Sequence, residues 1–289
     1  MTSVAKEQDN WSAKQYTQTA AFVPVLTSKV VSLVDLKPDD VILDLGAGDG
    51  ILSIAIASKV KTVHATDSSR SMVEYTQQRI NDAGDAARNL TTAVVDARFI
   101  GQAGLPRGVY NKVFSNAALH WILRDQATRT QVFKDVYDLL PTGGQFVAEF
   151  GGHGNVAEIY TAISSAVRRQ WAKKGGIDGQ EVTHEYIRDN LSPWFFSDKE
   201  TTLKYLTDAG FRVQHLELEY RPTELPQGDD GARGWLDTFG FSFWKGLTGD
   251  EKEQVIQEVI EALRFSAFVE SRGVWVVGYV RLRFKAIKD

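Results

Sequence analysis

The chain has 289 residues, 43% of them hydrophobic, which suits one large α/β domain spanning residues 1–289. Its formal net charge of −4 gives no global electrostatic reason to bind DNA, RNA or an anionic membrane. The absence of cysteine excludes disulfides, thiolate nucleophiles and cysteine-ligated zinc.

The first ten residues are polar and carry both signs of charge, which is unlike a signal or transit peptide. No apolar stretch reaches the roughly 18 residues needed to cross a bilayer. We therefore expect a cytoplasmic protein, a monomer or homodimer, that binds neither nucleic acid nor membrane.

Strands and helices alternate through the first part of the chain, which predicts a parallel sheet covered on both faces. Residues 13–36 are expected to form one or two helices. The predicted strands are residues 41–45, 62–66, 90–95, 112–116 and 145–150, and the predicted helices among them are residues 52–60, 71–83, 126–140 and 155–173.

The pattern loosens after residue 174. Residues 274–285 form a long alternating segment with Trp275, Val277, Tyr279 and Arg281 on one face, which is typical of an antiparallel strand near a sheet edge. We expect a doubly wound, mostly parallel, seven-stranded sheet with an antiparallel last strand and a helical cap. The other elements predicted here are a strand at residues 211–218 and helices at 198–209, 231–244 and 250–263.

The strongest local signal is a buried strand that runs directly into a glycine-rich turn, Asp44-Leu45-Gly46-Ala47-Gly48-Asp49-Gly50, and then into a helix. Glycine allows positive φ and a close approach of the backbone to a ligand. The following helix offers unpaired N–H groups and a positive dipole end. Because ligands of open α/β sheets bind at the carboxyl ends of the strands, this turn predicts a cofactor site.

The spacing of the glycines separates two cofactor classes. A dinucleotide fingerprint needs its third glycine at position 51, which is Ile51, so a nicotinamide dehydrogenase is disfavoured. The spacing Asp44-x-Gly46-x-Gly48-x-Gly50 instead resembles the first motif of class I S-adenosylmethionine-dependent methyltransferases. In that family the turn packs against the methionine and adenosine parts of a cofactor that has no pyrophosphate.

Two acids at strand ends agree with this resemblance. Asp67 ends the second strand, where an acid can accept hydrogen bonds from both ribose hydroxyls. Asp96 ends the third strand, where the resemblance implies a contact with the adenine amine, with the Ala97 N–H on the ring. Either acid alone would also suit a helix N-cap. The resemblance predicts S-adenosylmethionine as cofactor, no metal, and a cofactor-binding set of Asp44, Gly46, Ala47, Gly48, Gly50, Asp67, Ser68, Met72, Asp96, Ala97 and Asn116.

The resemblance extends beyond the cofactor half. Segment 115–121, Ser-Asn-Ala-Ala-Leu-His-Trp, is similar to the end of the fourth strand in trans-aconitate methyltransferases and their relatives. Leu140-Pro141-Thr142-Gly143-Gly144 resembles the turn before strand five, and matches continue to segment 279–284. This implies a Rossmann-like methyltransferase fold and a small-molecule substrate.

Methyl transfer needs alignment of donor and acceptor, and removal of a proton when the acceptor is a neutral O–H or N–H. His120 and Trp121 follow the fourth strand and are expected at the pocket. His120 is then a general base, a hydrogen-bond partner of a carboxylate acceptor, or a packed or cofactor-contacting residue. His153, just after strand five, is a second candidate for base or substrate contact.

An antiparallel last strand would carry the preceding link across the carboxyl edge of the sheet. The aromatic residues of that link are then either a cap over the substrate or local core. We expect a helical lid at residues 1–36 with Trp11 and Tyr16, a cofactor-binding half at 37–153, and a substrate half at 154–289 with cap helices at about 224–265. The aromatic residues of the link are Trp235, Phe239, Phe241, Phe243 and Trp244.

The leading hypothesis is methylation of a small molecule, with a carboxylate oxygen as the first candidate acceptor. A hydroxyl, amine or thiol of a secondary metabolite, or a carboxyl group on an acyl-carrier protein, are alternatives. The chain lacks an Asn-Pro-Pro-aromatic tetrad after strand four, which disfavours amino groups of nucleic-acid bases and protein amides. A catalytically idle regulatory partner is the hypothesis from a different class.

Overall fold

The computed structural model describes residue 11 and residues 27–226 and 228–289. Its strands are β1 (Val41–Leu45), β2 (Thr62–Asp67), β3 (Leu90–Val94), β4 (Lys112–Asn116), β5 (Gln145–Gly151), β6 (Phe211–Glu224), β7 (Phe268–Val269) and β8 (Val274–Lys288). Its α-helices are α3 (Ser28–Val34), α4 (Ile51–Ala57), α5 (Arg70–Ala83), α6 (Leu119–Ile122), α7 (Arg129–Leu139), α8 (Ala157–Lys173), α9 (His184–Tyr186), α10 (Lys199–Asp208), α11 (Gly231–Phe239) and α12 (Gly249–Ala267). Shorter helical turns are η1 (Gly84–Ala87), η2 (Ala97–Gln102), η3 (Ile187–Leu191), η4 (Gly228–Asp230) and η5 (Phe241–Trp244).

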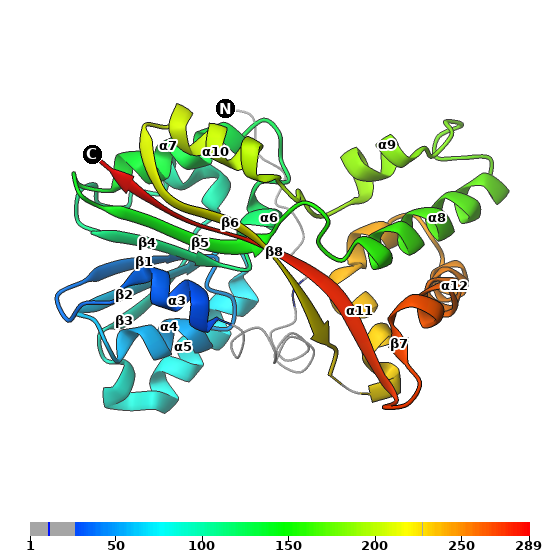
Figure 1. The fold of residues 1–289 in the computed structure, drawn as a ribbon, viewed down its shortest axis with the longest axis horizontal. Helices are drawn as coiled ribbons and strands as arrows, with labels where there is room; N and C mark the ends of the chain where they lie inside the picture. Colours follow the sequence, from blue (N-terminus) through cyan, green and yellow to red (C-terminus); the bar gives the residue numbers. More distant parts are fainter. Residues whose placement is uncertain (1–10, 12–26, 227) are drawn as a thin grey trace.

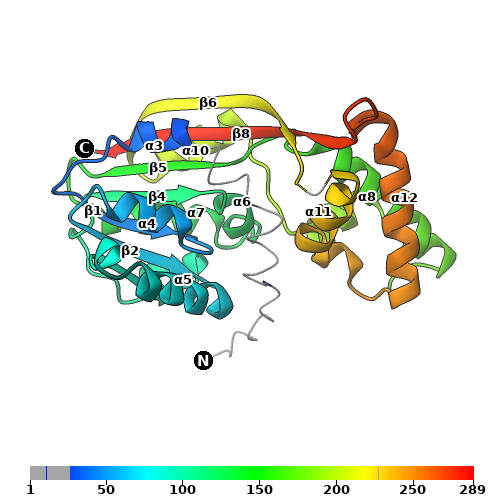
Figure 2. The ribbon, with the colours of Figure 1, turned by 90° about the horizontal axis from the view of Figure 1, so that it is seen from below.

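Figure 1 shows an open sheet with helices on both faces and, beside it, a group of helices that we call the helical lobe: α8, α9, α11 and α12. The long strands β6 and β8 run out of the sheet towards this lobe (Figures 1 and 2). Within the described residues, no helix is long and apolar enough to cross a membrane.

The main sheet has the order β3-β2-β1-β4-β5-β8-β6. Strands β1 to β5 are parallel, and β8 lies antiparallel between β5 and β6. The short β7 pairs with β8 outside this path. The predicted mostly parallel seven-stranded sheet with an antiparallel last strand is confirmed.

Burial on both faces explains why the parallel strands are almost continuously apolar. In β1, Ile42 packs with the side chains of α3, α4 and α5, whereas Leu43 and Leu45 pack with those of η2, α7 and α10. Strand β8 contributes to two cores. Trp275 and Val277 belong to the core of the helical lobe, and residues of its second half, such as Phe284, belong to the sheet core.

The N-terminal prediction is only partly tested, because residues 12–26, including Tyr16, lie outside the described residues. Helix α3, which falls inside the predicted lid, is instead packed against β4, β5 and β8. Val30 and Val34 are four residues apart and fully buried, so the apolar side of α3 covers the sheet. The lid assignment of residues 1–36 as a whole stays a prediction.

Strand β6 is six residues longer than predicted. It pairs with β8 from Phe211 to Glu224, with a register shift between Val213 and His215. Pro222 within this segment weakened the strand pattern, because proline cannot donate a ladder hydrogen bond. Strand β6 lies at the edge of the sheet, where the loss of one ladder hydrogen bond is tolerated.

Candidate active site

The glycine turn after β1 is attached to the end of β2. The N–H groups of Gly46 and Ala47 donate to the Thr66 carbonyl oxygen at 2.8 and 2.9 Å, and the Gly48 N–H donates to Asp67 Oδ2 at 2.9 Å. Asp67 Oδ1 accepts from the Ser69 N–H at 2.9 Å. The predicted pair of turn and acid is thus brought together by direct hydrogen bonds.

Two glycines of the turn have different surroundings. A Cβ on Gly46, whose φ is +74°, would lie 2.3 Å from the Cβ of Ala118, so the turn packs tightly against the segment that follows β4. A Cβ on Gly48, whose φ is +58°, would meet no described atom within 4 Å. The backbone at Gly48 is therefore open on the side where a ligand could approach closely.

Asp44 lies beneath the turn and is 3% exposed. Its Oδ2 accepts a hydrogen bond of 2.6 Å from Ser53 Oγ, which links β1 to α4. Burial raises the pKa of Asp44 to about 7, against a smaller lowering by Ser53, and the charge of Asp67 raises it further. The structure thus places Asp44 as a buried support of the turn.

This pKa predicts an unusual pH dependence. Between about pH 4, the value for an unfolded aspartate, and about pH 7, the folded state holds a proton that the unfolded state has lost. The free energy of unfolding should therefore fall as pH rises through this window, by up to about 1.4 kcal/mol per pH unit, relative to Asp44→Asn. Urea unfolding of both proteins at pH 5, 6, 7 and 8 measures the difference. If the free energies of unfolding of the two proteins changed with pH in the same way, the prediction would be contradicted.

The remaining predicted cofactor residues lie around the same strand ends. Ser68 is exposed just after β2, and Met72 is buried in the first turn of α5, where its N–H donates to Ser69 Oγ. Asp96 follows β3 and accepts from Arg98, both from its N–H at 3.0 Å and from its guanidinium at 2.7 Å. Ala97 is buried beside it.

Asn116, the last residue of β4, supplies a test of whether a ligand fits here. Its Oδ1 is buried and has no hydrogen-bond partner in the described part of the chain. A buried acceptor without a donor is costly, and a hydroxyl or ammonium group of a ligand would satisfy it. With the open backbone at Gly48, this fits an amino-acid nucleoside such as S-adenosylmethionine.

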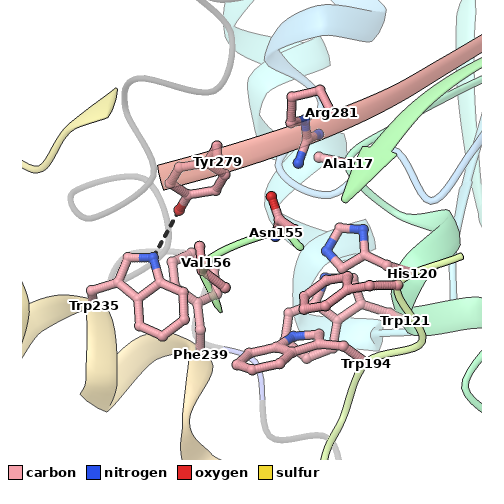
Figure 3. A pocket seen from close by; sticks show the side chains of 11 residues that line it. Ala117, His120, Trp121, Asn155, Val156, Trp194, Trp235, Phe239, Tyr279 and Arg281 are labelled. Atoms are coloured by element: carbon pink, nitrogen blue, oxygen red, sulfur yellow. Dashed lines mark hydrogen bonds between the residues drawn. The ribbon is translucent and has the colours of Figure 1, made fainter. Parts of the chain in front are cut away.

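A partly open cavity lies between the sheet and the helical lobe (Figure 3). The segments after β4 and β5, the link before α10, helix α11 and strand β8 all contribute to its wall. The lining residues are Ala117, His120, Trp121, Asn155, Val156, Trp194, Phe196, Trp235, Phe239, Tyr279 and Arg281.

His120, on α6, is 8% exposed in this wall. Its Nδ1 accepts a hydrogen bond of 3.3 Å from the Gly151 N–H. Burial, together with the positive charge of Arg281, lowers the pKa of His120 well below its usual value. His120 is therefore neutral, and because Nδ1 is an acceptor, the proton lies on Nε2. In this form its remaining ring nitrogen is a hydrogen-bond donor.

The other polar groups of the wall are also donors or amides. Tyr279 accepts a 2.7 Å hydrogen bond from Trp235 Nε1, and burial raises the pKa of Tyr279 to about 12, so its hydroxyl keeps its proton. Asn155 Oδ1 accepts from the Val280 N–H at 3.0 Å, which orients its amide nitrogen. The described lining residues contain no Asp, Glu, Lys or Cys.

Arg281 is 5% exposed and is anchored through Nε to Glu149 Oε1 at 3.3 Å. Glu149, at the end of β5, is 1% exposed and also contacts Arg221 at 3.3 Å and Arg283 Nε at 2.8 Å. Three arginines thus surround one buried carboxylate. Burial lowers the pKa of Arg281, with the nearby charge of Glu149 opposing the change.

Aromatic rings form a continuous wall around the rest of the cavity. Trp121 lies 5.7 Å from Trp194 and 6.4 Å from Phe239, between ring centroids. The ring of Trp11 packs edge-on to Trp121 at 4.9 Å, and its carbonyl oxygen accepts from Ser71 Oγ on α5. Residue 11 thus contacts both the cavity wall and the helix that starts beside Asp67.

The predicted residues divide into those that the cavity brings together and those that lie elsewhere. His120 and Trp121 line it, as do Trp235 and Phe239. His153 does not: it is exposed, its N–H donates to the Ser197 carbonyl oxygen, and it is absent from the lining. Chain reversal directly after β5 turns it away. Of the remaining link aromatics, Phe241 stacks on Trp121, whereas Phe243 and Trp244 are buried in the core of the helical lobe.

Sequence reasoning missed five of the nine lining residues that have polar or aromatic side chains. Arg281 had a signal, because it shares a strand face with Trp275, Val277 and Tyr279, and an arginine on an apolar face indicates a buried charge. A buried charge needs a partner of opposite charge, but which residue is that partner depends on the order of the strands in the sheet. The missed lining residues are Asn155, Trp194, Phe196, Tyr279 and Arg281.

Comparisons with known proteins agree with these features. Residues 42–144 match the family described as methyltransferase domain. The uncharacterized methyltransferase C70.08c of Schizosaccharomyces pombe is 35% identical over 285 residues, covering 98% of this chain and 99% of its own. The malonyl-[acyl-carrier protein] O-methyltransferase of a Marinomonas species is 27% identical over 188 residues, covering 64% of this chain and 60% of its own.

Among solved structures, a putative methyltransferase of Bacillus halodurans superposes with a TM-score of 0.60 at 18% identity, covering 91% of this chain and 99% of that one. It has the same fold. S-adenosylmethionine is the methyl donor of the matched family. On the near full-length match to the S. pombe protein, this chain belongs to the class I S-adenosylmethionine-dependent methyltransferases.

Proposed function

We propose that this methyltransferase transfers a methyl group to a carboxylate oxygen of a small molecule bound in the cavity between the sheet and the helical lobe. The observation that carries the proposal is the polar character of the wall. His120, Tyr279 and Arg281 present hydrogen-bond donors, and the described lining residues include no carboxylate or lysine. Such a wall suits an anionic acceptor.

The proton balance supports the same acceptor. When bound, S-adenosylmethionine supplies a sulfonium methyl group, and the electron pair of the broken S–CH₃ bond stays on sulfur as the O–CH₃ bond forms. A carboxylate oxygen attacks without losing a proton, whereas a hydroxyl or ammonium acceptor must lose one. His120 is poorly suited as that base, because its pKa is lowered and its Nδ1 already accepts from Gly151.

In this proposal His120 Nε2–H donates to the acceptor carboxylate and holds one oxygen, so that the other faces the methyl donor. Asp67 binds the ribose hydroxyls, Asp96 and Ala97 bind adenine, and the open backbone at Gly48 lies along the cofactor. Residues 37–153 form the cofactor half, and residues 154–289 form the substrate half with a cap at about 224–265. Trp235 and Phe239 belong to the cap and line the cavity.

A relative adds support for the acceptor atom. The Marinomonas protein is named as an O-methyltransferase of a malonyl group on acyl-carrier protein. A malonyl group ends in a carboxylate, which is the same chemistry as proposed here. The resemblance of segment 115–121 to trans-aconitate methyltransferases points to a free small acid as substrate.

The test is a methyl-acceptor screen with matched functional groups. Purified protein is incubated with S-adenosylmethionine and 3-phenylpropionate, indole-3-acetate or trans-aconitate, and separately with 3-phenylpropanol and 3-phenylpropylamine. We expect methyl esters from at least one acid, detected by mass spectrometry, and no product from the alcohol or amine. Methylation of the amine or alcohol without any ester would overturn the carboxylate assignment. Failure to bind S-adenosylhomocysteine would favour a catalytically idle partner protein.

Variants of His120 distinguish a donor from a base. Gln can accept from the Gly151 N–H and still donate from its amide nitrogen, so His120→Gln should retain kcat/KM within about 10-fold of the parent. His120→Leu has neither group and should lose about 10- to 100-fold. The kcat/KM of the parent should also show no histidine titration between pH 6 and 9. Equal losses in both variants, with a rise in rate near pH 6.5, would indicate a general base.

A further inference from the structure

Arg281 has hydrogen-bonding capacity that the described protein does not use. Its side chain is 5% exposed, and its one hydrogen bond within the described residues runs from Nε to Glu149. The two terminal nitrogens, with four N–H donors, make none in that part of the chain. Figure 3 shows the end of this side chain directed into the cavity. These donors face the cavity, where an anionic ligand could accept from them.

The negative charges around Arg281 are unevenly distributed. Glu149 carries one negative charge and contacts three guanidinium groups. Two further acids, Glu217 and Glu219, contact Arg283 from the more exposed side. They add their negative charge at Arg283, and neither has an ion pair with Arg281. An anion at the cavity end of Arg281 would pair with its terminal nitrogens, which none of these acids contacts.

We call the end of the cavity with Arg281 and His120 its polar end; the Tyr279 hydroxyl lies towards the other end, bonded to Trp235. Arg281 acts electrostatically on His120, and Figure 3 shows both with Ala117 at one end. Trp235 and Phe239 are at the opposite end of that view, 5.2 Å apart between ring centroids. Ala117 follows β4 and is bonded to β5 through its N–H, so the polar end is the end nearest the strand termini that carry the glycine turn.

We propose that Arg281 is the specificity-determining residue that binds the substrate carboxylate through its two terminal nitrogens, and that the substrate is an acid with an aromatic or otherwise apolar body. That this carboxylate also receives the methyl group rests on the proposed function. Glu149 is the positioning residue, because its contact with Nε fixes the plane of the guanidinium. A planar guanidinium matches the two oxygens of a carboxylate.

The body of the substrate follows from the rest of the wall. Trp121 and Phe196 pack against the His120 ring, at 5.5 and 5.7 Å between ring centroids, and Trp194 packs against both of them. Such a surface buries flat apolar groups favourably and offers no second cation among the described lining residues. An acid with several carboxylates would have to bury the others against these rings.

Binding of matched acid and amide probes tests the inference without turnover. Calorimetry with saturating S-adenosylhomocysteine compares 3-phenylpropionate with 3-phenylpropionamide, indole-3-acetate with indole-3-acetamide, and succinate with succinamide. We expect the parent to bind an aromatic acid about 10- to 100-fold more tightly than its amide, as for a charge-assisted pair. Succinate should show no such preference.

Variants of Arg281 complete the design. Arg281→Met should abolish the preference for acid over amide, while Arg281→Lys should retain part of it. Arg272→Met, which removes an exposed arginine paired with Glu224, is the matched control and should leave the preference unchanged. Circular dichroism and S-adenosylhomocysteine affinity check the fold of each variant. Should Arg281→Met fail to fold, Arg281→Lys alone must still lower the preference several-fold.

The outcomes separate this inference from the proposed function. If no acid binds the parent better than its amide, or Arg281→Met keeps the preference, the inference is wrong. If Arg281→Met mainly weakens S-adenosylhomocysteine, Arg281 contacts the cofactor and the inference is wrong. If Arg281 controls acid binding but no acid is methylated, the binding role stands and the proposed function fails.

Discussion

Asp67→Ala should lower the affinity for S-adenosylhomocysteine by about 100-fold or more, because it removes charge-assisted hydrogen bonds to the ribose. A carboxylate has about four acceptor sites, so its contacts with the N–H groups of Gly48 and Ser69 are compatible with hydroxyl contacts. Asp67→Asn keeps one acceptor oxygen and should lose about 10-fold. Calorimetric titration measures both.

The control for this prediction is Asp82→Ala, which removes an exposed carboxylate from α5 and should leave binding unchanged. Thermal unfolding without ligand checks that the glycine turn survives, since Asp67 also holds Gly48. An Asp67→Ala protein that binds S-adenosylhomocysteine within a few-fold of the parent would show that the ribose lies elsewhere. NAD should bind none of these proteins.

The second large effect concerns stability. Glu149→Gln should lower the free energy of unfolding by about 3–5 kcal/mol, because it leaves buried guanidinium groups without their counter-charge. Glu149 is 1% exposed and lies opposite Arg283 in the register of β5 and β8, with Arg283 itself fully buried. Removal of the carboxylate leaves Arg283 only its contacts with Glu217 and Glu219, and leaves Arg281 without an ion pair among the described residues.

Urea unfolding followed by circular dichroism measures this loss, with an unchanged m-value as the sign that the same folded state unfolds. The matched control is Glu224→Gln. Glu224 also lies on a strand beside β8, but its ion pair with Arg272 is about half exposed and should contribute at most about 1 kcal/mol. A cost for Glu149→Gln no larger than that of the control would mean that the three arginines do not depend on this carboxylate.

The cofactor half was largely predictable because its signals are local. A buried strand, a turn with glycines at fixed spacing and an acid at the end of the next strand follow from steric rules over a few residues. The structure accordingly has β1 at the predicted residues, and Gly48 and Asp67 in direct contact. Two acids of this half have side-chain partners that the pattern did not indicate, Ser53 for Asp44 and Arg98 for Asp96.

The substrate half was less predictable, because its side chains come from distant parts of the sequence. The order of the strands in the sheet decides which of them are in contact. Sequence left His120 open between base and donor, and the choice depends on the Gly151 N–H, which lies 31 residues away. The helical cap was expected from its aromatic residues, yet Phe243 and Trp244 had no local feature to separate them from Trp235 and Phe239. All four are buried in the core of the helical lobe, and the tertiary position of α11 brings Trp235 and Phe239 to the cavity.

The sequence by itself determined the class of fold, the position of the glycine turn and the kind of cofactor, since each depends on the periodicity of short segments. Tertiary structure alone decided that β8 lies between β5 and β6, and this order brings Arg281 to Glu149 and His120. Arg281 is 132 positions from Glu149 in the sequence, and still farther from His120. Hydrogen bonds and charges over such separations exist only once the sheet has formed, and they define the chemistry of the cavity.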